Sequence, residues 1–101
     1  MRTLMVRYKT KETEAEVNAQ LVRAVYDELR AVRPAGLRYG TFRLPDGVSF
    51  IHFASMETPA AGDALTGLAS FKAFQKDIAA RCVEPPVPTE LTAVDSYGLF
   101  V

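Results

Sequence analysis

A short turn in the middle of the chain, Pro45-Asp46-Gly47, most constrains what this sequence can fold into. It joins two apolar runs, 37–44 and 48–54, each of strand length. Proline presets the backbone for a turn, aspartate tolerates the turn, and glycine supplies a positive φ. Two strand-like runs joined this closely predict an antiparallel hairpin.

A helix is expected before the hairpin, over residues 13–33. Thr13 is the expected N-cap, with Glu16 three residues later completing a capping box. The segment ends at Pro34-Ala35-Gly36, a helix-stopping sequence. Apolar residues recur along it at spacings of three and four, which predicts one buried stripe: Leu21, Val22, Val25, Leu29 and Val32.

The N-terminal residues 3–9 alternate in polarity, as a strand does. Leu4, Val6 and Tyr8 share one face of that strand. Met5 lies on the opposite face, so both faces are expected to have some apolar cover.

A second helical region is expected after the hairpin. Thr58 and Pro59 suit a cap and a first helical position. Gly62 and Gly67 weaken the stretch, so a break is expected near 67–70 and a firmer helix after it. Four residues fall on one face of that later helix: Phe71, Phe74, Ile78 and Cys82.

Residues 84–88 contain three prolines and are expected to form an extended arm. The last strand is expected over 91–100. The order β-α-β-β-α-β in 101 residues predicts one α+β domain, 1–101, with the ferredoxin-like fold. Its antiparallel sheet then has the strand order 4-1-3-2, with both helices on one face.

The uncovered face of that sheet is not expected to be polar, because neither alternate set of residues in any strand is purely hydrophilic. A sheet that is apolar on both sides needs a second cover. A copy of the same chain, related by a two-fold axis, supplies one. The sequence therefore predicts a homodimer through the sheet face, with a monomer carrying scattered exposed apolar residues as the alternative.

Composition excludes several classes of protein. The 12 basic and 12 acidic residues cancel, which gives no reason to expect a nucleic-acid or membrane partner. One cysteine, the lack of a signal-peptide pattern and the lack of a membrane-length apolar run favour a cytoplasmic protein. One histidine and one cysteine, far apart, provide no zinc-ligand spacing, and no glycine-rich phosphate loop is present. No metal and no cofactor are expected.

His52 and Arg7 are the candidate catalytic residues. His52 is the only side chain whose ordinary pKa lies near neutrality, so it is the natural group for proton transfer. The alternative is a half-buried histidine that only satisfies a neighbour. Arg7, on the N-terminal strand, is expected either to bind an anionic group of a substrate or to form a structural ion pair with Asp95 or with the partner subunit.

Aromatic residues are numerous and suggest a binding pocket between sheet and helices, although aromatics most often build the core. The glycine-containing stretch 58–70 is the expected mobile lip of such a pocket. Cys82 is expected to be a buried, inert thiol. The candidate substrate-binding residues are Tyr39, Tyr97, Phe50, Phe71 and Phe74.

Several segments together resemble the dimeric α/β-barrel superfamily, and within it the small proteins similar to antibiotic-biosynthesis monooxygenases. They are Met5-Val-Arg-Tyr-Lys9, Pro34-Ala-Gly-Leu-Arg-Tyr39, Leu68-Ala-Ser-Phe-Lys-Ala-Phe-Gln75, Glu84-Pro-Pro-Val-Pro-Thr-Glu-Leu91 and Val94-Asp-Ser-Tyr97. The resemblance runs the whole length of the chain and implies the fold and a dimer. Some oxygenases of the family place a tryptophan and an asparagine at the substrate, and its haem degraders use a histidine on a helix. This chain has no tryptophan, its histidine is on a strand, and its one asparagine, Asn18, is in the first helix, so the resemblance carries over no catalytic residue.

Three functions are therefore expected as alternatives. The first is a cofactor-independent monooxygenase-like or isomerase-like enzyme, acting on an apolar or aromatic compound with His52 as base and Arg7, Tyr39 or Tyr97 stabilising an enolate. The second is a non-catalytic small-molecule-binding or structural homodimer. The third is a haem-binding or haem-degrading protein.

Overall fold

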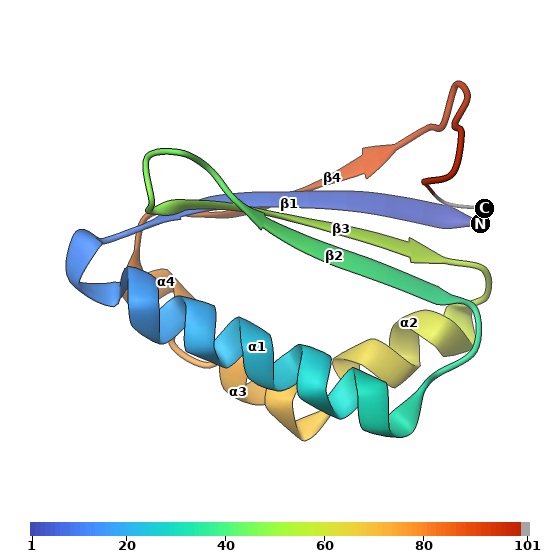
Figure 1. The fold of residues 1–101 in the computed structure, drawn as a ribbon, viewed down its shortest axis with the longest axis horizontal. Helices are drawn as coiled ribbons and strands as arrows, with labels where there is room; N and C mark the ends of the chain where they lie inside the picture. Colours follow the sequence, from blue (N-terminus) through green and yellow to red (C-terminus); the bar gives the residue numbers. More distant parts are fainter. Residues whose placement is uncertain (100–101) are drawn as a thin grey trace.

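The computed structural model describes residues 1–99, which form a four-stranded antiparallel sheet with helices on one side (Figure 1). The sheet order is β2-β3-β1-β4, which confirms the predicted order read from the other edge. The ferredoxin-like α+β fold is thereby confirmed. The strands are β1 (Arg2–Thr10), β2 (Leu37–Arg43), β3 (Ser49–Met56) and β4 (Cys82–Leu91).

The long helix α1 (Ala15–Val32) crosses the sheet and ends where the sequence predicted. Arg33 adopts a left-handed conformation after it and its backbone N–H bonds to the Leu29 carbonyl at 2.7 Å. The predicted capping box is wrong: a 3₁₀ turn, η1 (Glu12–Glu14), precedes the helix, and Thr13 lies inside that turn. Glu16, in the first turn of α1, instead accepts a hydrogen bond from Arg43 at the end of β2.

The predicted break in the second helical region is confirmed, and a further break follows it. The region divides into α2 (Pro59–Thr66), α3 (Ala69–Gln75) and α4 (Ile78–Arg81). Thr58 caps α2 as expected, accepting from the Ala61 amide. Asp77, at a φ of 59°, separates α3 from α4.

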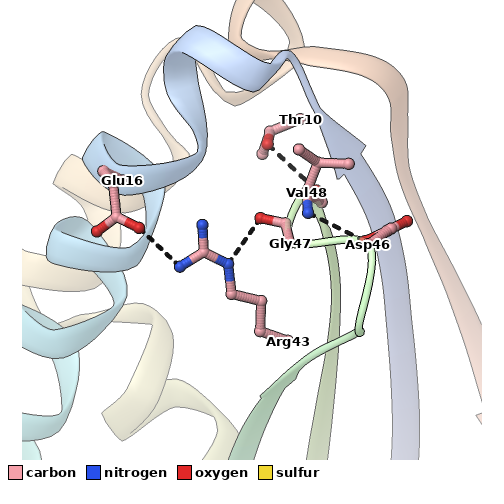
Figure 2. Close-up of polar contacts among 6 residues, drawn as sticks. All are labelled: Thr10, Glu16, Arg43, Asp46, Gly47 and Val48. Atoms are coloured by element: carbon pink, nitrogen blue, oxygen red, sulfur yellow. Dashed lines mark hydrogen bonds and ion pairs between the residues drawn. The ribbon is translucent and has the colours of Figure 1, made fainter.

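The hairpin between β2 and β3 is held by side chains of its own turn and by α1 (Figure 2). Asp46 accepts from the Val48 amide at 3.0 Å. Arg43 donates to the Gly47 carbonyl at 2.7 Å and to Glu16 of α1 at 2.8 Å (Figure 2). Gly47 has a φ of 78°, the positive value predicted for the glycine of this turn.

The last strand is not where the sequence predicted it. β4 spans Cys82–Leu91 and therefore includes the three prolines, whereas residues 92–99 contain no strand and Phe100 lies outside the described residues. Cys82 begins β4 and is not on a helix. β4 is an edge strand that pairs with β1 alone. An edge strand tolerates proline, because the position without an N–H can face solvent instead of a neighbouring strand. Pro85 and Pro86 lie together opposite Tyr8, where the register of β1 and β4 shifts.

The core lies between the sheet and the helices. It is built around Tyr8 of β1 and Phe50 of β3, which are each 2% exposed and stack with ring centroids 5.5 Å apart. Glu28 of α1 accepts from both the amide and the hydroxyl of Ser70, which fixes the start of α3 against α1. The remaining buried members are Ala19, Val22, Val25, Leu65, Leu68, Phe71 and Phe74.

The opposite face of the sheet carries apolar side chains without a cover from residues 1–99. The register places Met5 and Arg7 of β1 beside Ile51 and Phe53 of β3 on this face. Phe42 of β2 packs edge-on against Phe53 and remains 57% exposed. This outer face is the apolar second face that the sequence predicted.

Candidate functional site

A cavity of about 940 Å³ lies between the sheet and the helices α2, α3 and α4. Its walls are largely apolar, and it is large enough for a drug-sized molecule. The strands contribute the floor and the helices contribute the sides. Its lining includes one histidine and four aromatic residues: His52, Tyr8, Tyr39, Phe71 and Phe74.

His52 is the centre of a polar cluster at the cavity wall. It lies on β3 in phase with Phe50 and Ala54, so its ring faces the helices. Its Nε2 lies 2.8 Å from the Tyr8 hydroxyl. Its Nδ1 lies 2.6 Å from the Tyr39 hydroxyl and 3.1 Å from the Thr41 hydroxyl.

The cluster continues from Tyr8 into the helices. Asn18 of α1 donates from its Nδ2 to the Tyr8 hydroxyl at 2.8 Å. Its Oδ1 accepts from Arg81 of α4, with Nε at 3.4 Å and Nη2 at 3.3 Å. Five elements of the fold therefore supply one connected set of hydrogen bonds, which Tyr26 extends by a 2.8 Å bond to Thr41.

Burial keeps three members of this cluster neutral: His52, Tyr8 and Tyr39. It lowers the pKa of His52 to about 4, so the imidazole is uncharged at neutral pH. Burial raises the pKa of both Tyr8 and Tyr39 well above the ordinary tyrosine value, so both phenols keep their hydrogens. The site therefore offers hydrogen-bond donors and acceptors without a charged side chain at His52.

Aromatic rings hold the histidine in place. The rings of His52 and Phe74 lie 5.3 Å apart between centroids, and those of His52 and Tyr8 also lie 5.3 Å apart. Tyr26 of α1 stacks on Tyr39 at 5.4 Å. Offset aromatic packing of this kind restricts ring orientation in addition to burying area.

The structure brings together only some of the predicted site residues. His52, Tyr39, Phe71 and Phe74 line the cavity, while Phe50 lies beneath it in the core, stacked on Tyr8.

Arg7 and Tyr97 lie elsewhere. Arg7 is opposite Ile51 on the outer face of the sheet, away from the cavity. It cannot act with His52 within one chain. Tyr97 is fully exposed and lies beyond β4, because the last strand ends at Leu91.

Sequence reasoning missed Tyr8, Asn18, Thr41 and Arg81 as members of the site. The signal for Asn18 was available: it stands among Ala15, Ala19 and Val22 on the buried face of α1 and is itself 0% exposed. A polar side chain inside an apolar stripe requires hydrogen-bond partners. Arg81 carried no such signal, because it ends a short helix whose bounds the sequence did not define.

The helix α2 forms one edge of the cavity, as the predicted lip would. Pro59, Gly62 and Leu65 from this helix line the cavity, and Asp63 adds a carboxylate to the lining. Among residues 1–99 no three histidine, cysteine or acidic side chains cluster as metal ligands would. Over the same residues, no helix combines the length and the apolar character needed to cross a membrane.

Comparisons with solved structures identify the fold. An antibiotic biosynthesis monooxygenase superimposes with a TM-score of 0.77 at 16% identity, covering 94% of this chain and 100% of that one. The chain has the same fold as that protein. Rv0793 from Mycobacterium tuberculosis matches with a TM-score of 0.76 at 19% identity, covering 94% and 96% of the two chains. PA3566 from Pseudomonas aeruginosa matches with a TM-score of 0.75 at 20% identity, covering 93% and 94%.

The suspected likeness to antibiotic-biosynthesis-monooxygenase-like proteins is therefore confirmed at the level of the fold. The sequence itself matches no family model, and its comparison with curated proteins gives no match. At identities of 16–20% the likeness carries no residue of the site across. The chemistry has to be argued from the cavity and its polar cluster.

Proposed function

We propose that this protein binds a small apolar or aromatic compound in the cavity and acts on it as a cofactor-independent monooxygenase-like enzyme. The observation that carries the proposal is the position of His52, which lies between two tyrosine hydroxyls at the wall of a large apolar cavity. The shared fold with a protein named as an antibiotic biosynthesis monooxygenase supports the class of reaction.

The substrate itself supplies the electrons in such a reaction. A substrate methylene activated by a neighbouring carbonyl loses two hydrogens, one oxygen atom of O₂ becomes a new carbonyl, and the other leaves as water: R₂CH₂ + O₂ gives R₂C=O + H₂O. The first step is removal of a proton to form an enolate. The protein then needs a base, a donor to the enolate oxygen, and an apolar site that excludes water.

The polar cluster suits the first two of these roles. The proton passes to the Tyr8 oxygen while the Tyr8 hydrogen moves to Nε2 of His52, since these atoms are 2.8 Å apart. The Tyr39 hydroxyl donates to the enolate oxygen. The low pKa of His52 disfavours the imidazolium, and the negative charge of the enolate beside it offsets that cost.

The test is oxygen consumption with a panel of aromatic ketones and polyketide-like compounds, measured for matched tyrosine variants. Tyr39→Phe removes the hydroxyl beside His52, whereas Tyr97→Phe makes the same change at a fully exposed tyrosine. Turnover should fall at least roughly tenfold in Tyr39→Phe and stay unchanged in Tyr97→Phe. His52→Gln should abolish turnover, and equal rates in all variants would contradict the proposal. Product formation without O₂ uptake would indicate an isomerase-like reaction instead.

A non-catalytic binding protein is the second candidate, and one observation favours it. Both ring nitrogens of His52 already have partners within the chain, as in a histidine whose role is structural. A compound from the same panel that stabilises the protein, but is recovered unchanged after prolonged incubation in air, would favour this candidate.

We also propose that the protein is a homodimer joined through the outer face of the sheet. Phe42 is 57% exposed and Val87 is 59% exposed on this face, and Ile51 and Phe53 lie between them. Burying these side chains against a second copy removes apolar surface from water. Sedimentation should give a dimer for the native chain and a monomer for Phe42→Lys. A native monomer at micromolar concentration would contradict the proposal.

A further inference from the structure

Arg81 is a buried cation with only backbone and amide acceptors around it. Its side chain is held by carbonyl oxygens near the end of α3, with Nη2 2.6 Å from the Phe74 oxygen and Nη1 2.9 Å from the Lys76 oxygen. The residue is 7% exposed. A guanidinium donates hydrogen bonds and accepts none. Any group that meets it must therefore present an acceptor.

This requirement fixes the orientation of the Asn18 amide. Asn18 is completely buried and lies between Arg81 and Tyr8. Its oxygen must face the guanidinium, so its NH₂ group must face the Tyr8 hydroxyl. The reverse orientation would set two donors against each other in the core, at a cost that buried polar groups avoid.

The direction of the next hydrogen bond follows. The Tyr8 oxygen accepts from Asn18, so its single hydrogen is free to be donated onward. The partner on that side is Nε2 of His52, at 2.8 Å. A neutral imidazole has one bare nitrogen and one N–H, so Nε2 is the bare nitrogen and Nδ1 carries the hydrogen.

We propose that Asn18, held by Arg81, is a positioning residue that fixes the hydrogen of His52 on Nδ1 and thereby makes Tyr39 a hydrogen-bond donor to the cavity. Nδ1–H donates to the Tyr39 oxygen at 2.6 Å, with Thr41 as a second acceptor at 3.1 Å. Tyr39 then has one hydrogen to donate, either to Thr41 or to a bound molecule. Tyr39 is half-buried, whereas His52 is 4% exposed, so a ligand reaches the Tyr39 hydroxyl more readily than the imidazole.

Tyr39 as a donor narrows the class of ligand that the cavity should bind. This extension rests on the proposed function. The cavity should select apolar molecules that present an acceptor oxygen, such as an aromatic ketone, over molecules of the same shape that present an N–H or O–H donor. Specificity of this kind comes from the unpaired group that the wrong ligand would leave in an apolar site.

The tautomer is measured by nitrogen-15 NMR of the ring, and His52 is the only histidine in the chain, so no assignment problem arises. At pH 8 the ligand-free native protein should show a bare Nε2 and a protonated Nδ1. Asn18→Asp should reverse this: both carboxylate oxygens accept, one from Arg81 and one from Tyr8, so Nε2 must donate to the Tyr8 oxygen. A native protein with the hydrogen on Nε2, or an Asn18→Asp variant with unchanged nitrogen shifts, would overturn the proposal.

A second variant tests the same proposal in case Asn18→Asp does not fold. Arg81→Met removes the cation and frees the Asn18 amide to rotate, so the single tautomer should become a mixture. Arg43→Met is the matched control, because Arg43 binds the hairpin and α1 outside the cluster and should leave the shifts unchanged. A single Nδ1–H tautomer in Arg81→Met would contradict the role of the cation.

Ligand preference is read with two tricyclic probes of the same shape, 9-fluorenone, which only accepts, and carbazole, whose N–H only donates. The native protein should bind fluorenone roughly twofold to tenfold more tightly, and Asn18→Asp should reverse the preference. Tighter binding of carbazole to the native protein would overturn the assignment of Tyr39 as donor. If neither probe binds, nor any aromatic ketone of the panel, the proposed function fails, while the nitrogen-15 measurement decides the tautomer on its own.

Discussion

The single buried histidine makes the pH dependence of stability a sharp test of the site. Burial lowers the pKa of His52 from an ordinary value of 6.5 to about 4 in the folded protein. Between these two values the unfolded chain binds a proton at this residue and the folded chain does not. The free energy of unfolding must therefore fall as the pH falls through this window. Above pH 7 the contribution of His52 stays constant.

The size of the effect follows from the shift. The fall in the pKa from 6.5 to about 4 limits the total loss to about 3 kcal/mol, and linkage gives a loss of about 1 kcal/mol between pH 6 and pH 5. Hydrogen bonds also lower the pKa values of Glu16, Glu28 and Asp46 in the folded protein. Those carboxylates lose their contribution as the pH falls below about 4.5, which is below the interval from pH 6 to pH 5.

The assay is urea unfolding at half-unit steps from pH 7 to pH 4.5, for the native protein and His52→Gln. The glutamine amide can accept from Tyr8 and donate to Tyr39, so it keeps the polar partners while removing the titration. The difference between the two proteins should grow by about 1 kcal/mol between pH 6 and pH 5. Parallel pH profiles for the two proteins would refute the claim that His52 is buried and neutral.

Three further changes test the fold around the site. Phe74→Ala should cost about 3–5 kcal/mol in urea unfolding, because Phe74 is 5% exposed and packs on His52 and Tyr8. Gly36→Ala should cost about 1 kcal/mol or more in the same assay, because Gly36 has a φ of 75° and a Cβ there would lie 3.2 Å from the Glu57 Cβ. Asp46→Ala should lower the thermal midpoint, since the carboxylate accepts three hydrogen bonds at the hairpin turn; an unchanged midpoint would show that the turn does not need them.

The order of elements could be predicted because local signals agree with the tertiary structure there. The turn at Pro45-Asp46-Gly47 and the stop at Pro34 both act within a few residues. Thr58 and Pro59 likewise begin α2 through local hydrogen bonding and a fixed φ. Such signals do not depend on which strands lie at the edge of the sheet.

The last strand could not be placed by local signals, because three prolines in a strand are acceptable only at an edge. Whether 82–91 is an edge depends on which strands pair, and that is a property of the whole chain. Misplacing this strand also put Tyr97 in the sheet. Arg7 had been placed on the correct strand, but its face depended on which alternate set of residues met the helices.

The polar cluster was only partly visible in the sequence. His52 was singled out by its chemistry, whereas Asn18 and Arg81 lie 34 and 29 positions away from it in the chain. The pairings that join them are 10 to 63 residues apart in sequence. Long-range hydrogen bonds of this kind arise from packing α1 and α4 against the sheet, so they follow from the fold and cannot precede it.

The prolines of β4 have a consequence for how copies of this sheet can associate. Pro88 pairs with Val6 of β1, and neither Pro88 nor Pro86, two positions earlier, has a backbone N–H. A further strand laid along this side would find a broken row of donors. Extension of the sheet by an added strand is therefore favoured beyond β2, at the other edge. Strand pairing between folded copies is then favoured at one edge alone, and such pairing joins two copies without building an open-ended fibril.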